Sequence, residues 1–185
     1  MRKLLFICAI ILLPFISSAK EKTPGIPLVC DTVLVAEGLT ADQIYQNLKV
    51  WFANHMRSAQ NVIQLDDAAN KHIIGKANIP MTVNNFTWSC LTGVIHFTID
   101  VAARDGRFRL RMLDFSHEAF RDGWTEGPVY VKGPNPDIKG MRKKQNSEMQ
   151  KRAAPLCIDH IALTIVSMQE AMKANANNTA TEGDW

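Results

Sequence analysis

Three arginines alternate with apolar residues in the stretch Arg107–Met112, and they are the first candidates for chemistry in this sequence: Arg107, Arg109 and Arg111. A guanidinium group is permanently charged, and its planar fork matches a carboxylate or a phosphate. Alternation with period two would place all three side chains on one face of a β-strand. The pattern therefore predicts either a surface for an anionic partner or the solvated face of an ordinary hairpin.

The strand that carries these arginines is the second arm of a predicted hairpin. Asp105-Gly106 suits a two-residue turn, because glycine adopts positive φ without steric cost. Counting outward from this turn pairs Asp100 with Arg111 on the polar face. The same count places Val101 beside Leu110 on the opposite, apolar face. We therefore expect one side of the hairpin to face the core.

The candidate partner-binding residues are those of the polar face that the cross-strand pairing leaves uncommitted. We expect an ion pair with Asp100 to occupy Arg111. The remaining candidates are Arg107, Arg109, His96 and Thr98. Leu113 and Phe115 break the alternation, which predicts a bulge or a strand end near Asp114.

Motifs for catalysis, metal binding or cofactor binding are weak in this chain. His117-Glu118 is followed by Arg121 where a zinc-protease helix needs its second histidine. The sequence also contains no glycine-rich phosphate loop and no paired-cysteine zinc spacing. We therefore predict no catalytic, metal or cofactor residues. The alternative hypothesis is a small hydrolase-like enzyme that uses Cys90 or His117.

The first residues have the composition of a targeting segment. Arg2-Lys3 precedes the apolar run Leu4–Ile16, which is followed by Ser17-Ser18-Ala19. The run is too short for a membrane span, which needs about 20 residues. We predict a signal peptide over residues 1–19, cleaved near Ala19, and an exported protein that is periplasmic or extracellular. No later stretch predicts a membrane span in the mature chain.

The net charge bears on the class of partner, and the cysteine content bears on possible disulfides. Loss of Arg2 and Lys3 with the signal peptide lowers the formal net charge from +3 to +1. This balance gives no electrostatic indication of nucleic-acid binding. Removal of the signal peptide leaves Cys30, Cys90 and Cys157, and two arrangements stay open: three free thiols, or one disulfide between Cys30 and Cys157.

Hydrophobic periodicity predicts the elements that position these residues. In chain order they are a strand at Leu28–Ala36, a helix at Thr40–Met56, strands at Val62–Asp66 and His72–Ile79, the two arms of the hairpin, and a helix at Pro155–Met172. The first helix starts with a capping box of Thr40 and Gln43, and its apolar stripe predicts Trp51 and Phe52 in the core. The order β-α-β-β-β-β-α predicts an α+β domain: an antiparallel sheet of about five strands with both helices on one face.

Four motifs in this order resemble an exported bacterial domain of unknown function with a TBP-like fold. They are Gly38-Thr40-Asp42-Tyr45, Trp51-Phe52, Ile63-Asp66-Asp67 and Asp105-Gly106-Arg107-Phe108-Arg109. The resemblance covers roughly residues 28–118 and implies an antiparallel sheet flanked by helices. It implies no activity, because none is established for the family, and "TBP-like" describes topology rather than DNA binding.

The remaining segments complete the predicted organisation. Residues 20–27 form a leader, and residues 28–174 form a single domain, with a C-terminal extension and helix over 119–174. Residues 175–185 form a disordered tail. A basic cluster in the extension indicates a solvated loop or attraction to an anionic envelope polymer: Lys139, Arg142, Lys143 and Lys144. We thus expect an exported, non-enzymatic binding or accessory domain, without a cofactor, for an unknown protein or envelope component.

Overall fold

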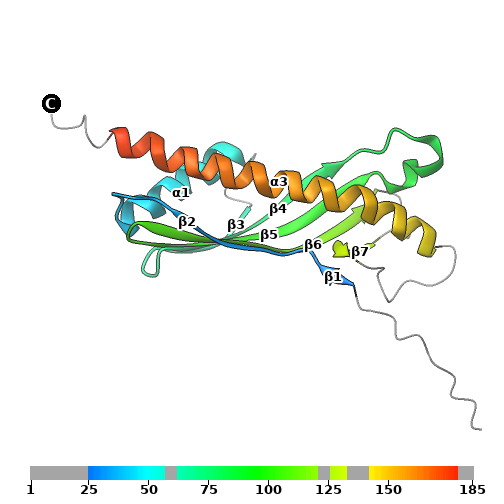
Figure 1. The fold of residues 1–185 in the computed structure, drawn as a ribbon, viewed down its shortest axis with the longest axis horizontal. Helices are drawn as coiled ribbons and strands as arrows, with labels where there is room; N and C mark the ends of the chain where they lie inside the picture. The colour runs from blue at the N-terminus through cyan, green and yellow to red at the C-terminus, as the bar shows by residue number, and fades with distance from the viewer. Residues whose placement is uncertain (1–24, 57–61, 121–125, 133–141, 179–185) are drawn as a thin grey trace, which may run out of the picture.

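The computed structural model describes residues 25–56, 62–120, 126–132 and 142–178 (Figure 1). Its main sheet is antiparallel, in the order β2-β6-β5-β4-β3, with β7 beside β6. The strands are β2 (Cys30–Val35), β3 (Ile63–Asp67), β4 (His72–Met81), β5 (Gly93–Arg104), β6 (Arg107–Ala119) and β7 (Glu126–Pro128). A second small sheet pairs β1 (Ile26–Pro27) with β8 (Tyr130–Lys132). The helices are α1 (Ala41–His55), the 3₁₀ helix η1 (Phe86–Leu91) and α3 (Arg142–Asn178).

This architecture confirms the predicted α+β fold class. The five predicted strands are β2 to β6, and the predicted hairpin register is correct: Asp100 lies opposite Arg111, and Val101 lies opposite Leu110. Both long helices lie on one side of the sheet, as Figure 1 shows. We call the face that they cover the inner face and the opposite one the outer face.

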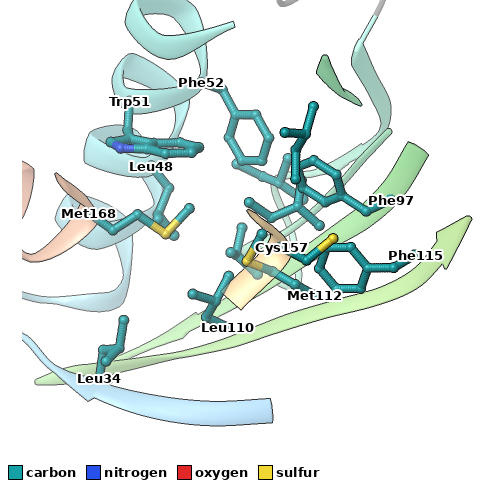
Figure 2. Packing of buried hydrophobic residues seen from close by; sticks show 14 of the residues in the cluster. Leu34, Leu48, Trp51, Phe52, Phe97, Leu110, Met112, Phe115, Cys157 and Met168 are labelled. Atoms are coloured by element: carbon teal, nitrogen blue, oxygen red, sulfur yellow. The ribbon is translucent and has the colours of Figure 1, made fainter. Parts of the chain in front are cut away.

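The core forms where α1 and α3 meet the inner face. Figure 2 shows Trp51 of α1 and Met168 of α3 on the helix side of the core, with Leu110 on the sheet side. Trp51 is buried; its Nε1 donates to Ser167 Oγ at 3.0 Å, and its ring stacks on His55. Phe52 is completely buried. The predicted core positions of Trp51 and Phe52 are therefore confirmed.

The start of α1 and the tip of the β5–β6 hairpin are joined, although they are far apart in the sequence. The predicted capping box is present, and Asp105 Oδ1 accepts a further hydrogen bond from the Ala41 N–H at 2.7 Å. Gly106, at φ +72°, donates from its N–H to the Leu39 carbonyl and accepts from the Ala36 N–H. Two of the resemblance motifs thus meet in space.

A third motif contact fixes α1 against β3. The Tyr45 hydroxyl donates to Asp66, and Lys49 Nζ lies 2.7 Å from the same carboxylate. Burial and the Asp66 carboxylate raise the pKa of Tyr45 to about 12, so the phenol stays a donor at neutral pH. These motif residues therefore join α1 to β3.

The break in alternation near Asp114 is a bulge. The β5–β6 register shifts between His96 and Thr98, and Asp114 has φ +58°. The extra residue returns Phe115 to the inner face, where its ring stacks on Phe97 with 5.3 Å between the ring centroids. The predicted bulge is confirmed.

The last helix begins earlier than predicted. α3 starts at Arg142 rather than at Pro155, so Lys143 and Lys144 of the basic cluster are helical and not in a loop. Lys139 lies outside the described residues. Pro155 lies on the exposed side of α3, where solvent can replace the hydrogen bond that proline does not donate.

Buried residues at helical spacing explain the earlier start. Met149, Ala153 and Cys157 form a stripe against the core, and this stripe begins before the proline. Gln150 accepts from the Tyr130 N–H and donates to the Pro128 carbonyl, both at 2.8 Å, so it fixes the β7–β8 segment to α3. Residues 175–178, assigned to the disordered tail by sequence, are helical as well.

Three further predictions concern the cysteines and the chain ends. Cys30, Cys90 and Cys157 are all free thiols here, so the Cys30–Cys157 disulfide is not formed. Burial raises the pKa of Cys157 to about 12.

The predicted signal peptide, residues 1–19, lies outside the described residues. Within the described ranges, no helix has the length and apolar character needed to cross a membrane.

Candidate functional site

No helix from the described residues covers the outer face of the sheet, which gathers polar side chains from four strands. Because side chains alternate along a strand, the residues opposite the core face share this surface. They are Asp31, Val33 and Val35 of β2, Arg107, Arg109 and Arg111 of β6, His96, Thr98, Asp100, Ala102 and Arg104 of β5, and His72, Lys76 and Asn78 of β4. All four predicted candidate residues therefore lie on the outer face.

Arg109 is committed to an ion pair, contrary to the sequence prediction. Its Nε and Nη2 donate to the two carboxylate oxygens of Asp31, at 2.8 and 2.5 Å. The Arg109 hydrogen bonds hold the pKa of the Asp31 carboxyl below its usual value, despite some desolvation. Asp31 stands on β2, far from Arg109 in sequence, and only the pairing of β2 with β6 brings the two together.

Arg111 is occupied as predicted. It donates to Asp100, whose side chain is only 8% exposed although it lies on the uncovered face. The same carboxylate also contacts His72 Nε2 at 2.8 Å, a partner that the sequence did not reveal. Asp100, Arg111 and His72, together with the Asp31–Arg109 pair, form a belt of ion pairs across the middle of the outer face.

Arg107 stays uncommitted on one side of this belt. It lies directly opposite Arg104 across the hairpin, and within the described ranges neither arginine forms an ion pair with a carboxylate. The two line a shallow recess of about 310 Å³ together with Val33, Ala102, Phe108 and Arg109. Two like charges directly opposite each other repel, so a carboxylate from elsewhere would be favoured here.

His96 and Thr98 lie on the other side of the belt and line a separate recess of about 400 Å³. We call it the polar hollow; it is lined by Lys76, Ala77, Asn78, His96, Phe97, Thr98 and Asp114. Thr98 Oγ1 donates to Asp114 Oδ2 at 3.2 Å, and His96 Nε2 lies 2.8 Å from Glu118 Oε2. The structure thus divides the four predicted residues between two places.

The β6 bulge positions the acidic side of the polar hollow. Asp114 has a left-handed backbone conformation, which is uncommon for a residue other than glycine within a strand. Bulges re-aim side chains and are frequent beside functional sites. Lys76 and Asn78 supply the opposite side, and the sequence prediction missed both. Their alternation with Ile73, Gly75, Ala77 and Ile79 along β4 was the signal that could have placed them on this face.

The residues of the alternative hydrolase hypothesis are not arranged as an accessible pair. The His117 ring is completely buried, with Nε2 3.0 Å from the Leu91 carbonyl. Cys90 is half-buried at the end of η1. No group of three or more His, Cys, Asp or Glu side chains in the described part of the chain could hold a metal ion.

Comparison with known proteins finds a family that resembles the central part of the chain. Residues 31–118 match the model of a domain of unknown function, DUF4468, with a TBP-like fold. This stretch of the chain is therefore similar to the DUF4468 family. The match runs from β2 to the end of β6, so α3 lies outside it.

Two crystal structures resemble the fold over about three quarters of this chain. One is a DUF4468 family protein from Bacteroides ovatus, with 13% identity and a TM-score of 0.54, covering 77% of this chain and 86% of that chain. The other is a TBP-like protein from Parabacteroides distasonis, with 9% identity and a TM-score of 0.55, covering 77% of this chain and 93% of that one. At such identities the likeness shows the fold alone. No curated protein matches this chain significantly.

Proposed function

We propose that this protein is an exported, non-enzymatic binding domain, periplasmic or extracellular, and that its polar hollow binds a partner protein or another envelope component. The observation that carries the proposal is the strained Asp114 bulge, which aims a carboxylate into the hollow. Maintaining a non-glycine residue at positive φ costs about 1–3 kcal/mol, so such a conformation is often associated with a site.

The chemistry of the hollow favours a polar, hydrogen-bonding ligand group. Lys76 offers three N–H donors, Asn78 offers both donors and an acceptor, and Asp114 offers carboxylate oxygens. Lys76 and Asn78 are exposed, and within the described ranges neither forms an ion pair or a side-chain hydrogen bond. Side chains that lack internal partners can bind those of another molecule without first breaking a contact.

A capture experiment tests the binding role. The purified protein, immobilised, is exposed to envelope extract, and the retained molecules are compared with those retained by a Lys76→Ala/Asn78→Ala variant. We expect the variant to lose the retained partner while its melting temperature stays within about 2 °C, because both side chains are exposed. Lys143→Ala, an exposed lysine on α3, is the matched control and should retain the partner. Equal capture by the double variant would contradict the proposal.

Export is tested separately by the intact mass of the secreted species. We expect the mature chain to begin at Lys20, because Ser17-Ser18-Ala19 follows the apolar run. A chain that retains residues 1–19, or one that carries a lipid, would contradict the export part of the proposal.

The hydrolase alternative predicts a reactive thiol at Cys90. A catalytic cysteine has a depressed pKa and is alkylated rapidly at neutral pH. We expect Cys90 to be alkylated no faster than an unstructured cysteine peptide, and Cys157 to be the slowest thiol because of its burial. Rapid, selective alkylation of Cys90 would instead favour the enzyme.

A further inference from the structure

β2 is an edge strand with an open side. It pairs with β6 on one side, and no strand in the described part of the chain pairs with the other. The Ala36 N–H donates to the Gly106 carbonyl, so the backbone groups of Thr32 and Leu34 also face β6. By the alternation of an antiparallel ladder, the N–H and C=O groups of Val33 and its neighbours Asp31 and Val35 point toward the open side.

This edge has only one of the features that usually prevent strands from pairing, the charge of Asp31, and that charge is paired with Arg109. Cys30–Val35 contains no lysine, proline or bulge, and Val33 and Val35 are 56% and 60% exposed. The opposite edge strand, β3, differs: it has a register shift between Ile63 and Leu65 and ends in Asp66 and Asp67. The β3 edge is therefore better protected against pairing with another strand than the β2 edge.

We infer that the β2 edge pairs with the β2 edge of a second copy of this chain. The two strands run antiparallel about a two-fold axis at Val33, so that Val33 faces Val33 of the partner subunit. Both residues direct their backbone groups outward, as a hydrogen-bonded pair requires. A two-fold contact of one patch with itself is also the commonest form of homo-oligomer.

Complementary charges favour this register and favour a second copy of the chain as the partner. Arg107 lies beside Val35 in the β6–β2 ladder, and the next position across the seam is Asp31 of the partner subunit. Two strand spacings separate these Cα atoms by about 10 Å, which an extended arginine and an aspartate can bridge. Arg107 has no carboxylate within the described ranges, whereas Arg109 holds Asp31 from one side only. A carboxylate has lone pairs for a second guanidinium, so each seam position forms an Arg–Asp–Arg triad.

The dimer does not depend on the proposed binding role. It joins two main sheets edge to edge and leaves Lys76 and Asn78, which belong to β4, outside the seam. Failure of the capture experiment and failure of the dimer are therefore separate results.

The first test measures the oligomeric state. The protein, purified as the expressing cell processes it, is analysed by sedimentation velocity over a range of concentrations. We expect a concentration-dependent dimer, and Val33→Lys should raise its dissociation constant at least about tenfold, because two ammonium groups would then meet at the axis. Leu65→Lys is the matched control, since Leu65 is an exposed apolar residue on the other edge strand, and it should leave the dimer unchanged.

The second test measures the register. Directly opposed Cα atoms of a hydrogen-bonded pair are about 5.5 Å apart, which is within disulfide range. Val33→Cys should therefore form a disulfide-linked dimer on mild oxidation. Val35→Cys should not, because Val35 faces the partner's Asp31. Both variants retain the native cysteines, so these act as an internal control.

Three results would overturn the inference. A wild-type protein that stays monomeric at every concentration excludes the dimer. A dimer that withstands Val33→Lys uses another surface. Cross-linking of Val35→Cys as fast as that of Val33→Cys excludes the register and with it the Arg107–Asp31 contact across the seam.

Discussion

The same strands present two chemically opposite faces. On the inner face, residues such as Ile99, Val101, Leu110 and Met112 have no exposed surface and pack under α1 and α3. On the outer face, Arg109 and other charged residues form ion pairs in contact with solvent. Full burial of an apolar side chain stabilises a fold by about 1.5–3 kcal/mol, whereas an exposed ion pair contributes about 0–1 kcal/mol. Stability therefore belongs to the inner face, and the outer face can be varied for binding.

The largest effect is expected where a helix meets the inner face. Trp51→Ala should lower the free energy of unfolding by about 3–5 kcal/mol, because a large aromatic ring that is only 3% exposed leaves a cavity. Urea denaturation measures the change. Phe86→Ala is the control, since Phe86 is 98% exposed and its loss should change stability by less than about 0.5 kcal/mol. A loss below about 1 kcal/mol for Trp51→Ala would show that the core does not rest on this contact.

Gly75 on the inner face tests the effect of adding a side chain where the core has no room for one. A Cβ on Gly75 would lie 3.0 Å from Phe52 Cε1 and 3.3 Å from Ile99 Cγ2. Gly75→Ala should therefore reduce the free energy of unfolding by about 1–3 kcal/mol. Phe52→Leu shortens the opposing side chain, so its own cost should be smaller in the Gly75→Ala background. Strict additivity of the two changes would contradict the close approach.

Asp100 tests whether one outer-face residue behaves like a core residue. Asp100→Asn should cost about 1–3 kcal/mol, because it removes the buried negative charge between Arg111 and His72. Asp31→Asn is the matched control on the same face, with a carboxylate that is well exposed. If both substitutions reduce the urea midpoint equally, burial does not distinguish the two ion pairs.

The smallest effect expected is a pH dependence of the free energy of unfolding, which arises from the His160 side chain. Burial against the core lowers the pKa of His160 below its usual value of 6.5, so the folded state favours the neutral ring. The unfolded chain binds the proton first, and the stability contributed by neutral His160 is lost as pH falls below 6.5. Wild type should lose more stability than His160→Gln between pH 7 and about pH 5. Carboxylates with lowered pKa values, such as Asp66, act below this window. Parallel pH profiles of the two proteins would contradict the assignment.

The sequence predicted the inner face better than the outer one. Alternation along β5 and β6 and the capping box at Thr40 are local signals, so the hairpin register and α1 were predictable. The start of α3 was not, because Pro155 is typical of a first turn. Its apolar stripe, from Met149 onward, lies among charged residues that obscure the period.

The outer-face contacts could not be predicted because they depend on which strands become neighbours. Asp31 and Arg109 stand on β2 and β6, and His72 reaches Asp100 from β4. Alternation places a side chain on a face but does not say which strand lies beside it. The candidates were therefore on the correct face, whereas their partners and their division into two recesses came only from the tertiary structure.

The tip of the β5–β6 hairpin has a practical consequence for engineering. Tight turns at the surface are ordinarily good places for epitope tags, reporter domains or new chain termini. Here the Asp105-Gly106 turn is bonded to Ala36, Leu39 and Ala41 at the entry to α1. An inserted segment would detach the turn from the helix and remove a cap from its first N–H. Fusion at this tip should therefore unfold a helix that is distant in sequence.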